Sequence, residues 1–224
     1  MVLDEKYDVI VVGGGHAGCE AAYSAAKMGA NVLMITMNMQ TIGQMSCNPA
    51  MGGVAKGQIV REIDALGGGS ARITDKSMIQ FRMLNRSKGP AMWSPRVQSD
   101  RMLFAQYWRE LLEETPGLNM FQDMVTGLNV SDNTVHGVRT ALGLTFEAQT
   151  VVLTSGTFMN GLIHVGDQNF GGGRAGERAS TGITEGLVAM GFEAGRMKTG
   201  TPPRIDGRSL DFSVMEEQPG DERP

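Results

Sequence analysis

Apolar and polar positions at the start of the chain follow two different periods. The run Tyr7–Val12 is short, mostly apolar and rich in valine, and it predicts a strand inside a sheet. After a group of glycines, small residues recur on one face of a predicted helix: Ala17, Ala21, Ala22, Ala25 and Ala26. That helix ends at Gly29, and a second β-branched run follows at 31–36. The pattern predicts a strand–helix–strand unit with two parallel strands.

Two more helices are predicted before residue 115. The segment 43–57 is too rich in Gly, Pro and Asn to begin as a helix, and we expect it to be a long loop on the ligand side of the sheet. Residues 58–66 have apolar side chains at helical spacing and are followed by three glycines, which stop the helix. Another helix is predicted with Ser99 as its cap, running through Glu114.

The second half of the chain is predicted to form mainly strands. Residues 118–125 predict one strand, and short alternating runs over 128–153 predict a small antiparallel meander. The last of these runs is β-branched and ends in small residues, which is typical of a buried strand beside a ligand. A final helix is predicted with Ser180 or Thr181 as its cap, ending at about Met190.

The glycines after the first strand fit the phosphate-binding turn of a dinucleotide fold. Gly13, Gly15 and Gly18 have the spacing G-x-G-x-x-G, directly after a strand and at the start of a helix. Gly13 permits the tight turn, Gly15 lets the backbone approach a pyrophosphate, and Gly18 lets the helix lie close to the strand. The first amides of the helix and its dipole then face the phosphates. A tight turn without a ligand is the alternative interpretation.

Charge and cysteine usage narrow the possible classes. The net charge of −4 over 224 residues argues against a protein that binds nucleic acid with its whole surface. Cys19 and Cys47 lie 28 positions apart, so no C-x-x-C redox pair or zinc spacing exists, and a disulfide framework is not expected. The first residues lack the pattern of a signal peptide, and no segment approaches the ~18 apolar residues needed to span a membrane. We expect a cytoplasmic protein.

One stretch of this acidic chain is basic. Residues 82–109 contain six Arg or Lys side chains against a single acid, Asp100, and four aromatic residues lie among them. Such a stretch is able to follow an RNA backbone, with Trp93 stacking on a base. The alternative is a solvated helix face combined with aromatic residues of the core.

The dinucleotide is predicted to be FAD. In nicotinamide sites, an Asp or Glu about 20 residues past the glycine turn binds the ribose hydroxyls. Here that place falls between Thr36 and Asn38, where no acid occurs. The difference weakens an NAD site more than an FAD site, because the strand–helix–strand unit, the ligand-side loop and the meander together match flavoproteins.

The sequence as a whole resembles the glucose-inhibited division protein A family, flavoenzymes that modify the wobble uridine of tRNA. The segments that carry the resemblance are GGGHAGCEAA, IGQMSCNPAMGGVAKG, QFRMLNRSKGPAMWSPR, VVLTSGTFMNGLIHVG, GGRAGE and MKTGTPPRIDGRSLDFS. They extend over nearly the whole chain and are far more specific than the glycine turn. Because family members are substantially longer, the chain resembles the amino-terminal part of one.

The resemblance implies an activity and a set of cofactors and partners. It implies the addition of a carboxymethylaminomethyl or aminomethyl group at C5 of the wobble uridine, with FAD, NADH and methylene-tetrahydrofolate. It also implies tRNA as substrate, a partner GTPase, and a homodimer for the full-length protein. FAD is expected to contact Gly13, Gly14, Gly15, His16, Ala17, Gly18, Val125 and Ser180. The alternatives are a core residue for Val125, a helix cap for Ser180 and a satisfied first-turn side chain for His16.

Cys47 is the candidate catalytic residue that the resemblance implies. Uracil C5 is a poor nucleophile until a group adds at C6, and a thiolate is suited to that addition. A packed thiol near the cofactor is the alternative. Lys56 follows glycines, but Gly57 stands where a Walker motif needs Ser or Thr, so a nucleoside triphosphate site is not expected.

We therefore predict an α/β fold: a three-layer Rossmann-like FAD-binding domain with a parallel sheet and a β-meander, carrying insertions. The expected divisions are 1–198 for this domain, with a basic insert at about 82–124, and 199–224 for the start of a second inserted domain. Three other functions stay open: a general FAD/NADH oxidoreductase, a folate-dependent tRNA uridine methyltransferase, and a binding module without turnover. The chain alone is expected to bind FAD weakly and to be inactive.

Overall fold

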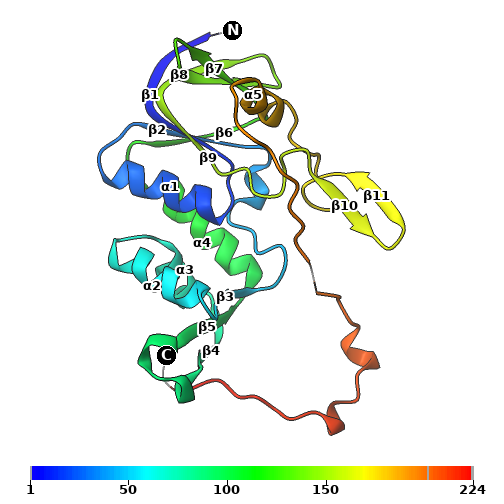
Figure 1. The fold of residues 1–224 in the computed structure, drawn as a ribbon. Helices are drawn as coiled ribbons and strands as arrows, with labels where there is room; N and C mark the ends of the chain where they lie inside the picture. The colour runs from blue at the N-terminus through cyan, green and yellow to red at the C-terminus, as the bar shows by residue number, and fades with distance from the viewer. Residues whose placement is uncertain (1, 201, 223–224) are drawn as a thin grey trace.

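The computed structural model describes residues 2–200 and 202–222, which are arranged around one six-stranded sheet (Figure 1). The strands lie in the order β6-β2-β1-β9-β8-β7. Their bounds are β1 Val2–Val12, β2 Val32–Thr36, β6 Leu118–Gln122, β7 Val125–Ser131, β8 Thr134–Thr140 and β9 Thr145–Leu153. The sheet combines a parallel half with an antiparallel half.

Four neighbouring strands form the parallel half. β1 pairs with β2 and with β9, and β2 pairs with β6, all in parallel. The helix α1 (His16–Lys27) connects β1 to β2, which confirms the predicted strand–helix–strand unit. The resulting order, with β1 between β2 and a later strand, is that of dinucleotide-binding folds. Such folds bind ligands at the carboxyl ends of the strands, where the strand order reverses.

The antiparallel half is the predicted meander. β7 pairs with β8, and β8 pairs with β9. The single strand predicted over 118–125 is wrong, because the segment contains β6 and the first residue of β7. Asp123 separates the two strands: its carboxylate accepts hydrogen bonds from the amides of Met124 (2.7 Å) and Leu142 (3.2 Å). The chain turns there from the parallel half into the meander.

Both faces of the parallel strands are buried in separate hydrophobic cores. Val11 of β1 and Met34 of β2 belong to a core shared with α1 and α4 (Arg101–Glu113). Their neighbours Ile10 and Ile35 belong to the second core, which the meander residues complete. Alternation between two buried faces is the period expected of strands covered on both sides. The helices, the parallel half of the sheet and the meander, which covers the second core, therefore form three layers, as the fold class predicts (Figure 1).

The helix α4 is the one predicted after residue 99, but its cap differs. Asp100 is the N-cap, and its carboxylate accepts hydrogen bonds from the amides of Met102 (2.8 Å) and Leu103 (3.0 Å). Ser99 instead ends β5 (Ser94–Ser99) and is buried. A carboxylate at this position satisfies two amides and complements the helix dipole, so the prediction of Ser99 is wrong by one residue.

A second sheet of three strands lies between β2 and α4 in the sequence. Its order is β3-β5-β4, and β3 (Ala50–Gly52) and β4 (Met78–Leu84) both run antiparallel to β5. The helices α2 (Lys56–Ala65) and α3 (Ser70–Lys76) lie beside it (Figure 1). The loop predicted over 43–57 therefore includes a short strand and the first residues of α2. The sequence did not predict this sheet, because Arg, Gln and Pro interrupt the alternation in β4 and β5.

The chain after the meander forms a hairpin, a short helix and an irregular tail. The hairpin is β10 (Leu162–Val165) with β11 (Gln168–Gly171), and α5 is Ile183–Ala189. The cap of α5 is Gly182, whose amide donates to the Glu185 carboxylate (2.9 Å), so neither residue predicted as the cap occupies that place. The tail is irregular as predicted, and it passes along the molecule to end beside β4 (Figure 1). Short 3-10 helices are η1 Met39–Thr41, η2 Arg86–Lys88, η3 Pro90–Met92, η4 Gly207–Ser209 and η5 Phe212–Val214.

The expected domain division stays a prediction. Of the segment expected as a basic insert, 82–124, β6 pairs within the main sheet and α4 packs against it, whereas β4 and β5 form the second sheet. In the described part of the segment 199–224, the secondary structure consists of the short 3-10 helices η4 and η5 within otherwise irregular chain.

Candidate functional site

A cavity of about 440 Å³ opens at the carboxyl ends of β1, β2 and β9. The glycine turn, the residues after β2 and the residues after β9 form its walls, and the loops 41–48 and 174–180 close it. Its size is that of a small-molecule site, and its place is the one where dinucleotide folds bind their ligands.

The three glycines of the turn have different surroundings. Gly13 has φ +111°, and a Cβ there would lie 2.7 Å from the carbonyl oxygen of Thr154. A Cβ on Gly18 would lie 1.8 Å from the carbonyl oxygen of Gly13, so the strand and helix approach as closely as predicted. A Cβ on Gly15 would meet no atom within 4 Å, because this residue faces the cavity. Gly13 and Gly18 are required by the fold, and Gly15 leaves room for a ligand.

The amino terminus of α1 is an anion site formed by backbone. Gly15 is its N-cap and offers no side chain to the first amides, and the first turn contains no acidic residue. Gly15, His16 and Ala17 all line the cavity. Free amides together with the positive end of the helix dipole favour a phosphate group at this place.

His16 connects the glycine turn to the loop that follows β2. Its Nε2 lies 3.1 Å from the carbonyl oxygen of Gly43, and its ring meets Phe104 edge-on with centroids 5.4 Å apart. Burial lowers the pKa of His16 below 6.5, and the cations of Lys56 and Arg174 lower it further against the opposing hydrogen bond to Gly43. The imidazole is therefore neutral at pH 7 and donates to Gly43. The side chain of His16 is therefore a satisfied first-turn histidine, which was the alternative interpretation, and His16 also borders the cavity.

An acidic side chain lies beside the end of β2, although the sequence places none there. Glu177, from the loop after β11, accepts hydrogen bonds from Asn38 Nδ2 (3.3 Å) and Thr41 Oγ1 (3.1 Å). Its other carboxylate oxygen lies 3.6 Å from Nε of Arg174. The carboxylate thus occupies the region where a dinucleotide fold binds ribose hydroxyls. The only signal in the sequence was the glycine-rich segment GGRAGE, which ends in this residue.

Arg174 holds this loop over the cavity. Its guanidinium donates to the side-chain oxygen of Gln44, pairs with Glu177 and lies 5.6 Å from the centroid of Phe158. These contacts join three segments that are far apart in the sequence. In the structure, Arg174 therefore forms a structural ion pair with Glu177.

Val125 and Ser180 meet at the wall next to the meander. Both are buried and line the cavity, and the Ser180 hydroxyl donates to the carbonyl oxygen of Val125 at 3.4 Å. Val125 begins β7 instead of ending the preceding strand, and Ser180 bridges two segments instead of capping α5. The structure therefore brings these two predicted residues together, with different local roles from those expected.

The two cysteines differ in their environments. Cys19 is fully buried in α1, its thiol contacts the carbonyl oxygen of Gly14 at 3.6 Å, and burial raises its pKa to about 12. Cys47 is exposed at the cavity, in the loop before β3. The guanidinium of Arg204 donates to the carbonyl oxygens of Ser46 and Cys47, which fixes this loop against the tail. Cys19 is a core residue, and Cys47 is accessible to a ligand.

Lys56 supplies a cation beside Cys47. Its Nζ lies 3.5 Å from the carbonyl oxygen of Ala50, and both Lys56 and Cys47 line the cavity. The residue is exposed, but partial desolvation of the ammonium lowers its pKa, while the charge of Cys47 opposes that change. From the sequence, Lys56 served only to exclude a Walker motif, whereas in the structure Lys56 lines the cavity.

The basic stretch divides into core and surface residues. Phe104 and Trp108 are fully buried in the first core, which is the alternative that the sequence left open for the aromatic residues. Trp93 is 40% exposed, and its indole donates to the carbonyl oxygen of Arg86 at 3.1 Å. Only Trp93 among these three presents a ring to solvent.

Two kinds of site are not found in residues 2–200 and 202–222. No helix of this part is long and apolar enough to cross a membrane. No group of three or more His, Cys, Asp or Glu side chains lies close enough together to hold a metal ion. Among the residues that line the cavity, the charged or nucleophilic side chains are the carboxylates of Asp123 and Glu177, the cations of Lys56 and Arg174, and the thiol of Cys47.

Comparisons with known proteins agree along the whole chain. The family model described as Glucose inhibited division protein A matches residues 8–224. A tRNA uridine 5-carboxymethylaminomethyl modification enzyme MnmG from Christiangramia forsetii is 68% identical over 223 residues, which are 100% of this chain and 36% of that relative. The enzyme of the same name from Cytophaga hutchinsonii is 69% identical over 98% of this chain and 35% of its own length. The chain spans about a third of the length of these curated relatives.

Solved structures share the fold described above. GidA from Aquifex aeolicus, in its form II crystal, is 49% identical with a TM-score of 0.94, covering 98% of this chain and 36% of that chain. The GidA-related protein from Thermus thermophilus is 25% identical with a TM-score of 0.60, covering 84% of this chain and 69% of that one. On these matches, which confirm the resemblance seen in the sequence, the chain belongs to the glucose inhibited division protein A family.

Proposed function

We propose that this chain is the FAD-binding, amino-terminal part of an enzyme that adds a carboxymethylaminomethyl or aminomethyl group at C5 of the wobble uridine of tRNA. The observation that supports FAD binding most directly is Gly15, which caps α1 with open space before it at the carboxyl end of β1. The names of the relatives, tRNA uridine 5-carboxymethylaminomethyl modification enzymes, support the substrate and the reaction.

The residues around the cavity fit FAD. The glycine turn would hold the pyrophosphate, because Gly13, Gly14, Gly15, His16 and Ala17 line the cavity. Gly18 does not line it, and the Gly13 amide already donates to the carbonyl oxygen of Ile35, so the amides that would serve the phosphates are those of Gly14, Gly15, His16 and Ala17. Glu177 with Asn38 would accept and donate hydrogen bonds at a ribose, which replaces the acidic residue missing after β2. Val125 and Ser180 would form the wall against the adenine. When bound, FAD supplies hydride and electron transfer.

Cys47 is the residue that we assign to the uridine. A thiolate at Cys47 would form a bond from Sγ to C6 of the uracil, and the C5–C6 electron pair would move toward the C4 carbonyl, which makes C5 nucleophilic. The Lys56 ammonium interacts with the charge of Cys47, and a neighbouring cation is a common feature of reactive cysteines. Exposure at the mouth of the cavity lets Cys47 meet a base as large as uracil.

Further cofactors and partners belong to the longer protein. We propose NADH as reductant, methylene-tetrahydrofolate as one-carbon donor, a GTPase partner, a homodimer and a cytoplasmic location for it. This chain alone is proposed to bind FAD weakly and to be inactive on tRNA. A general FAD/NADH oxidoreductase is less well supported, because it leaves the relatives' substrate and the basic stretch without a use.

A flavin titration of the purified chain tests the proposal. FAD and NADH are added separately to the wild type and to Gly15→Val, and binding is followed by flavin absorbance and by fluorescence. We expect FAD but not NADH to bind, and we expect Gly15→Val to weaken FAD binding at least ~10-fold, because its side chain would occupy the place of the pyrophosphate.

Gly195→Val is the matched control. A Cβ at Gly195 also meets no atom within 4 Å, but the residue lies outside the cavity, so FAD affinity should stay unchanged. Failure of the wild type to bind FAD, or equal affinity of the wild type and Gly15→Val, would contradict the proposal.

A further inference from the structure

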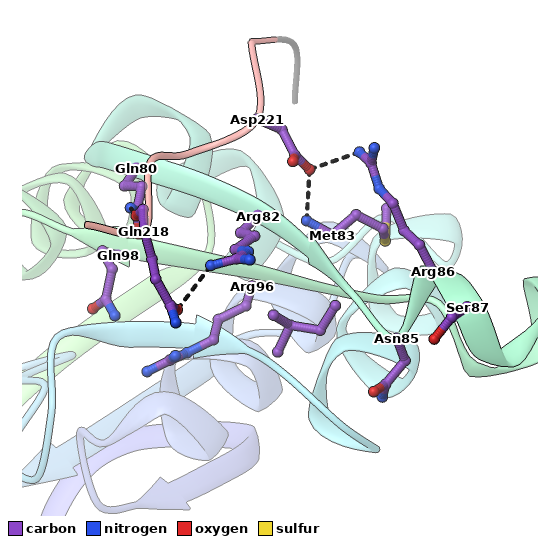
Figure 2. Close-up of a pocket in the computed structure, with 11 residues that line it drawn as sticks. Gln80, Arg82, Met83, Asn85, Arg86, Ser87, Arg96, Gln98, Gln218 and Asp221 are labelled. Atoms are coloured by element: carbon purple, nitrogen blue, oxygen red, sulfur yellow. Dashed lines mark hydrogen bonds and ion pairs between the residues drawn. The ribbon is translucent and has the colours of Figure 1, made fainter. Parts of the chain in front are cut away.

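A second cavity of about 660 Å³ lies on the small sheet and shares no lining residue with the first (Figure 2). Its walls come from β4, β5, η2 and the end of the tail, which contributes Gln218 and Asp221. The lining is mostly polar and includes three arginines, Arg82, Arg86 and Arg96, against one acid, Asp221. The proposed FAD site gives this cavity no role.

Two of the arginines face one another across the sheet. Arg82 of β4 is the register partner of Arg96 of β5, so their side chains leave the same face of the sheet directly opposite each other. Both line the cavity, and Figure 2 shows them side by side. Like charges at directly opposite positions destabilise a sheet. An anion bound between the two guanidinium groups would offset their repulsion and stabilise the strand pair.

The tail leaves this pair of charges uncompensated. Arg82 Nη1 donates to the side-chain oxygen of Gln218 at 2.8 Å, which is a neutral partner. The guanidinium of Arg96 makes neither a hydrogen bond nor an ion pair with any of the described residues. Two guanidinium groups therefore face the cavity without a counter-charge from residues 2–200 and 202–222.

The third arginine shows how an anion sits here. One carboxylate oxygen of Asp221 accepts from Arg86 Nη2 at 2.7 Å and from the Met83 amide at 2.8 Å (Figure 2). A guanidinium and a main-chain amide that share one oxygen are a usual arrangement for binding phosphate or carboxylate. Asp221 thus acts as an internal anion at the Arg86 end of the cavity. Among the described residues, the lining contains no second acidic residue that would do the same for Arg82 and Arg96.

We propose that this cavity is a phosphate-binding site, with Arg82 and Arg96 as its main ligands and Asp221 as an internal competitor at Arg86. Guanidinium groups bind phosphate oxygens in pairs, and the neutral donors beside them, Gln98 and Asn85, are able to complete the set. An RNA backbone and a free phosphate share this chemistry. The RNA source rests on the proposed function and would make this cavity a contact for the tRNA backbone.

Fluorescence anisotropy with a labelled anticodon stem-loop RNA tests the RNA source. We compare the wild type, Arg82→Gln, Arg96→Gln and Arg139→Gln over a series of salt concentrations. Each cavity variant should raise Kd about 5-fold and lower the slope of log K against log salt by about 0.7 to 0.9, the effect of one lost phosphate contact. Arg139 is the matched control, an exposed arginine of β8, a strand that lies at the opposite end of the molecule from β4 and β5 (Figure 1), and its variant should match the wild type.

Asp221→Asn gives a test in the opposite direction. Removal of the internal anion should lower Kd for RNA about 3-fold, and a variant that merely unfolds would not bind more tightly. In a second arm, titration with inorganic phosphate is followed by calorimetry on the same variants. Phosphate binding that is lost in Arg82→Gln and Arg96→Gln, without RNA binding, supports the site with a free phosphate compound as its source.

The proposal is overturned when neither RNA nor phosphate binding differs between the wild type and the two cavity variants, or when nothing binds. Flavin titration of the same samples separates this result from a failure of the proposed function. FAD binding lost at Gly15→Val but unchanged in the arginine variants leaves the first site in place, whatever the second cavity does.

Discussion

At the scale of residues, the cavity at the glycine turn depends on side chains that come from distant parts of the chain. The carboxylate expected after β2 is supplied instead by Glu177, which lies 139 positions beyond Asn38, its hydrogen-bond partner. Arg174 and Thr41 hold that carboxylate in place. A negative group at the ribose end and amides at the phosphate end give the cavity the polarity of a dinucleotide site.

We predict that Glu177→Gln weakens FAD binding about 10-fold, which is about 1.4 kcal/mol. The amide preserves the size of the side chain but loses the charge that strengthens hydrogen bonds to hydroxyl groups. The measurement is the same flavin titration. Glu193→Gln, an exposed glutamate in the segment after α5, is the control and should bind as the wild type does. Unchanged FAD affinity in Glu177→Gln would contradict a role for the Glu177 carboxylate in FAD binding.

At the scale of elements, the two helices α1 and α4 differ in the residue that caps their amino termini. α1 begins with Gly15, which leaves its amides open, and α4 begins with Asp100, which occupies them. An open helix terminus is able to bind a ligand, whereas a capped terminus stabilises the fold. The difference between the two helices separates the ligand site from the scaffold.

Asp100→Ala is predicted to lower the free energy of unfolding by about 1 kcal/mol, the usual cost of a lost N-cap. Urea denaturation followed by circular dichroism measures it. Ser99→Ala is the comparison, because the Ser99 hydroxyl is buried without a hydrogen bond to any described residue, and its removal should cost much less. A larger loss of unfolding free energy in Ser99→Ala than in Asp100→Ala would contradict Asp100 as the N-cap and favour Ser99.

At the scale of the whole molecule, the tail connects the two ends of the structure. It runs from α5 to the small sheet and ends beside β4 (Figure 1). On the way, Arg204 contacts the Cys47 loop, and at its end Asp221 hydrogen-bonds to the edge strand β4. The Asp221 amide donates to the carbonyl oxygen of Phe81 at 2.8 Å, which protects an edge strand from other pairing. The tail therefore touches both cavities.

Gly220→Val is predicted to release the end of the tail from β4. A Cβ at Gly220 would lie 2.9 Å from the carbonyl oxygen of Phe81, and backbone cannot yield as a flexible side chain does. Hydrogen exchange at the Met83 amide, which now donates to Asp221, should become at least ~10-fold faster. Gly195→Val should leave this exchange unchanged, and protection equal to that of the wild type in Gly220→Val would contradict the contact.

Patterns of short range were predictable from the sequence. The strand–helix–strand unit, the glycine turn, the meander and the irregular tail follow from periodicity and from glycine spacing, which act within about 30 residues. The boundary errors at Ser99 and 118–125 arose where a neighbouring residue offered a better hydrogen bond, as Asp100 and Asp123 do. Ser180 does not cap α5 because its hydroxyl donates to the carbonyl oxygen of Val125.

The sequence by itself therefore determined the layers of this protein, its glycine turn and, through the family resemblance, its proposed cofactor and its candidate Cys47. Only the tertiary structure decided which distant groups meet: Glu177 at the ribose end, Lys56 beside Cys47, and Arg82 opposite Arg96. The physical reason is that periodicity records which side of an element is buried, whereas a site depends on how loops from different elements approach one another.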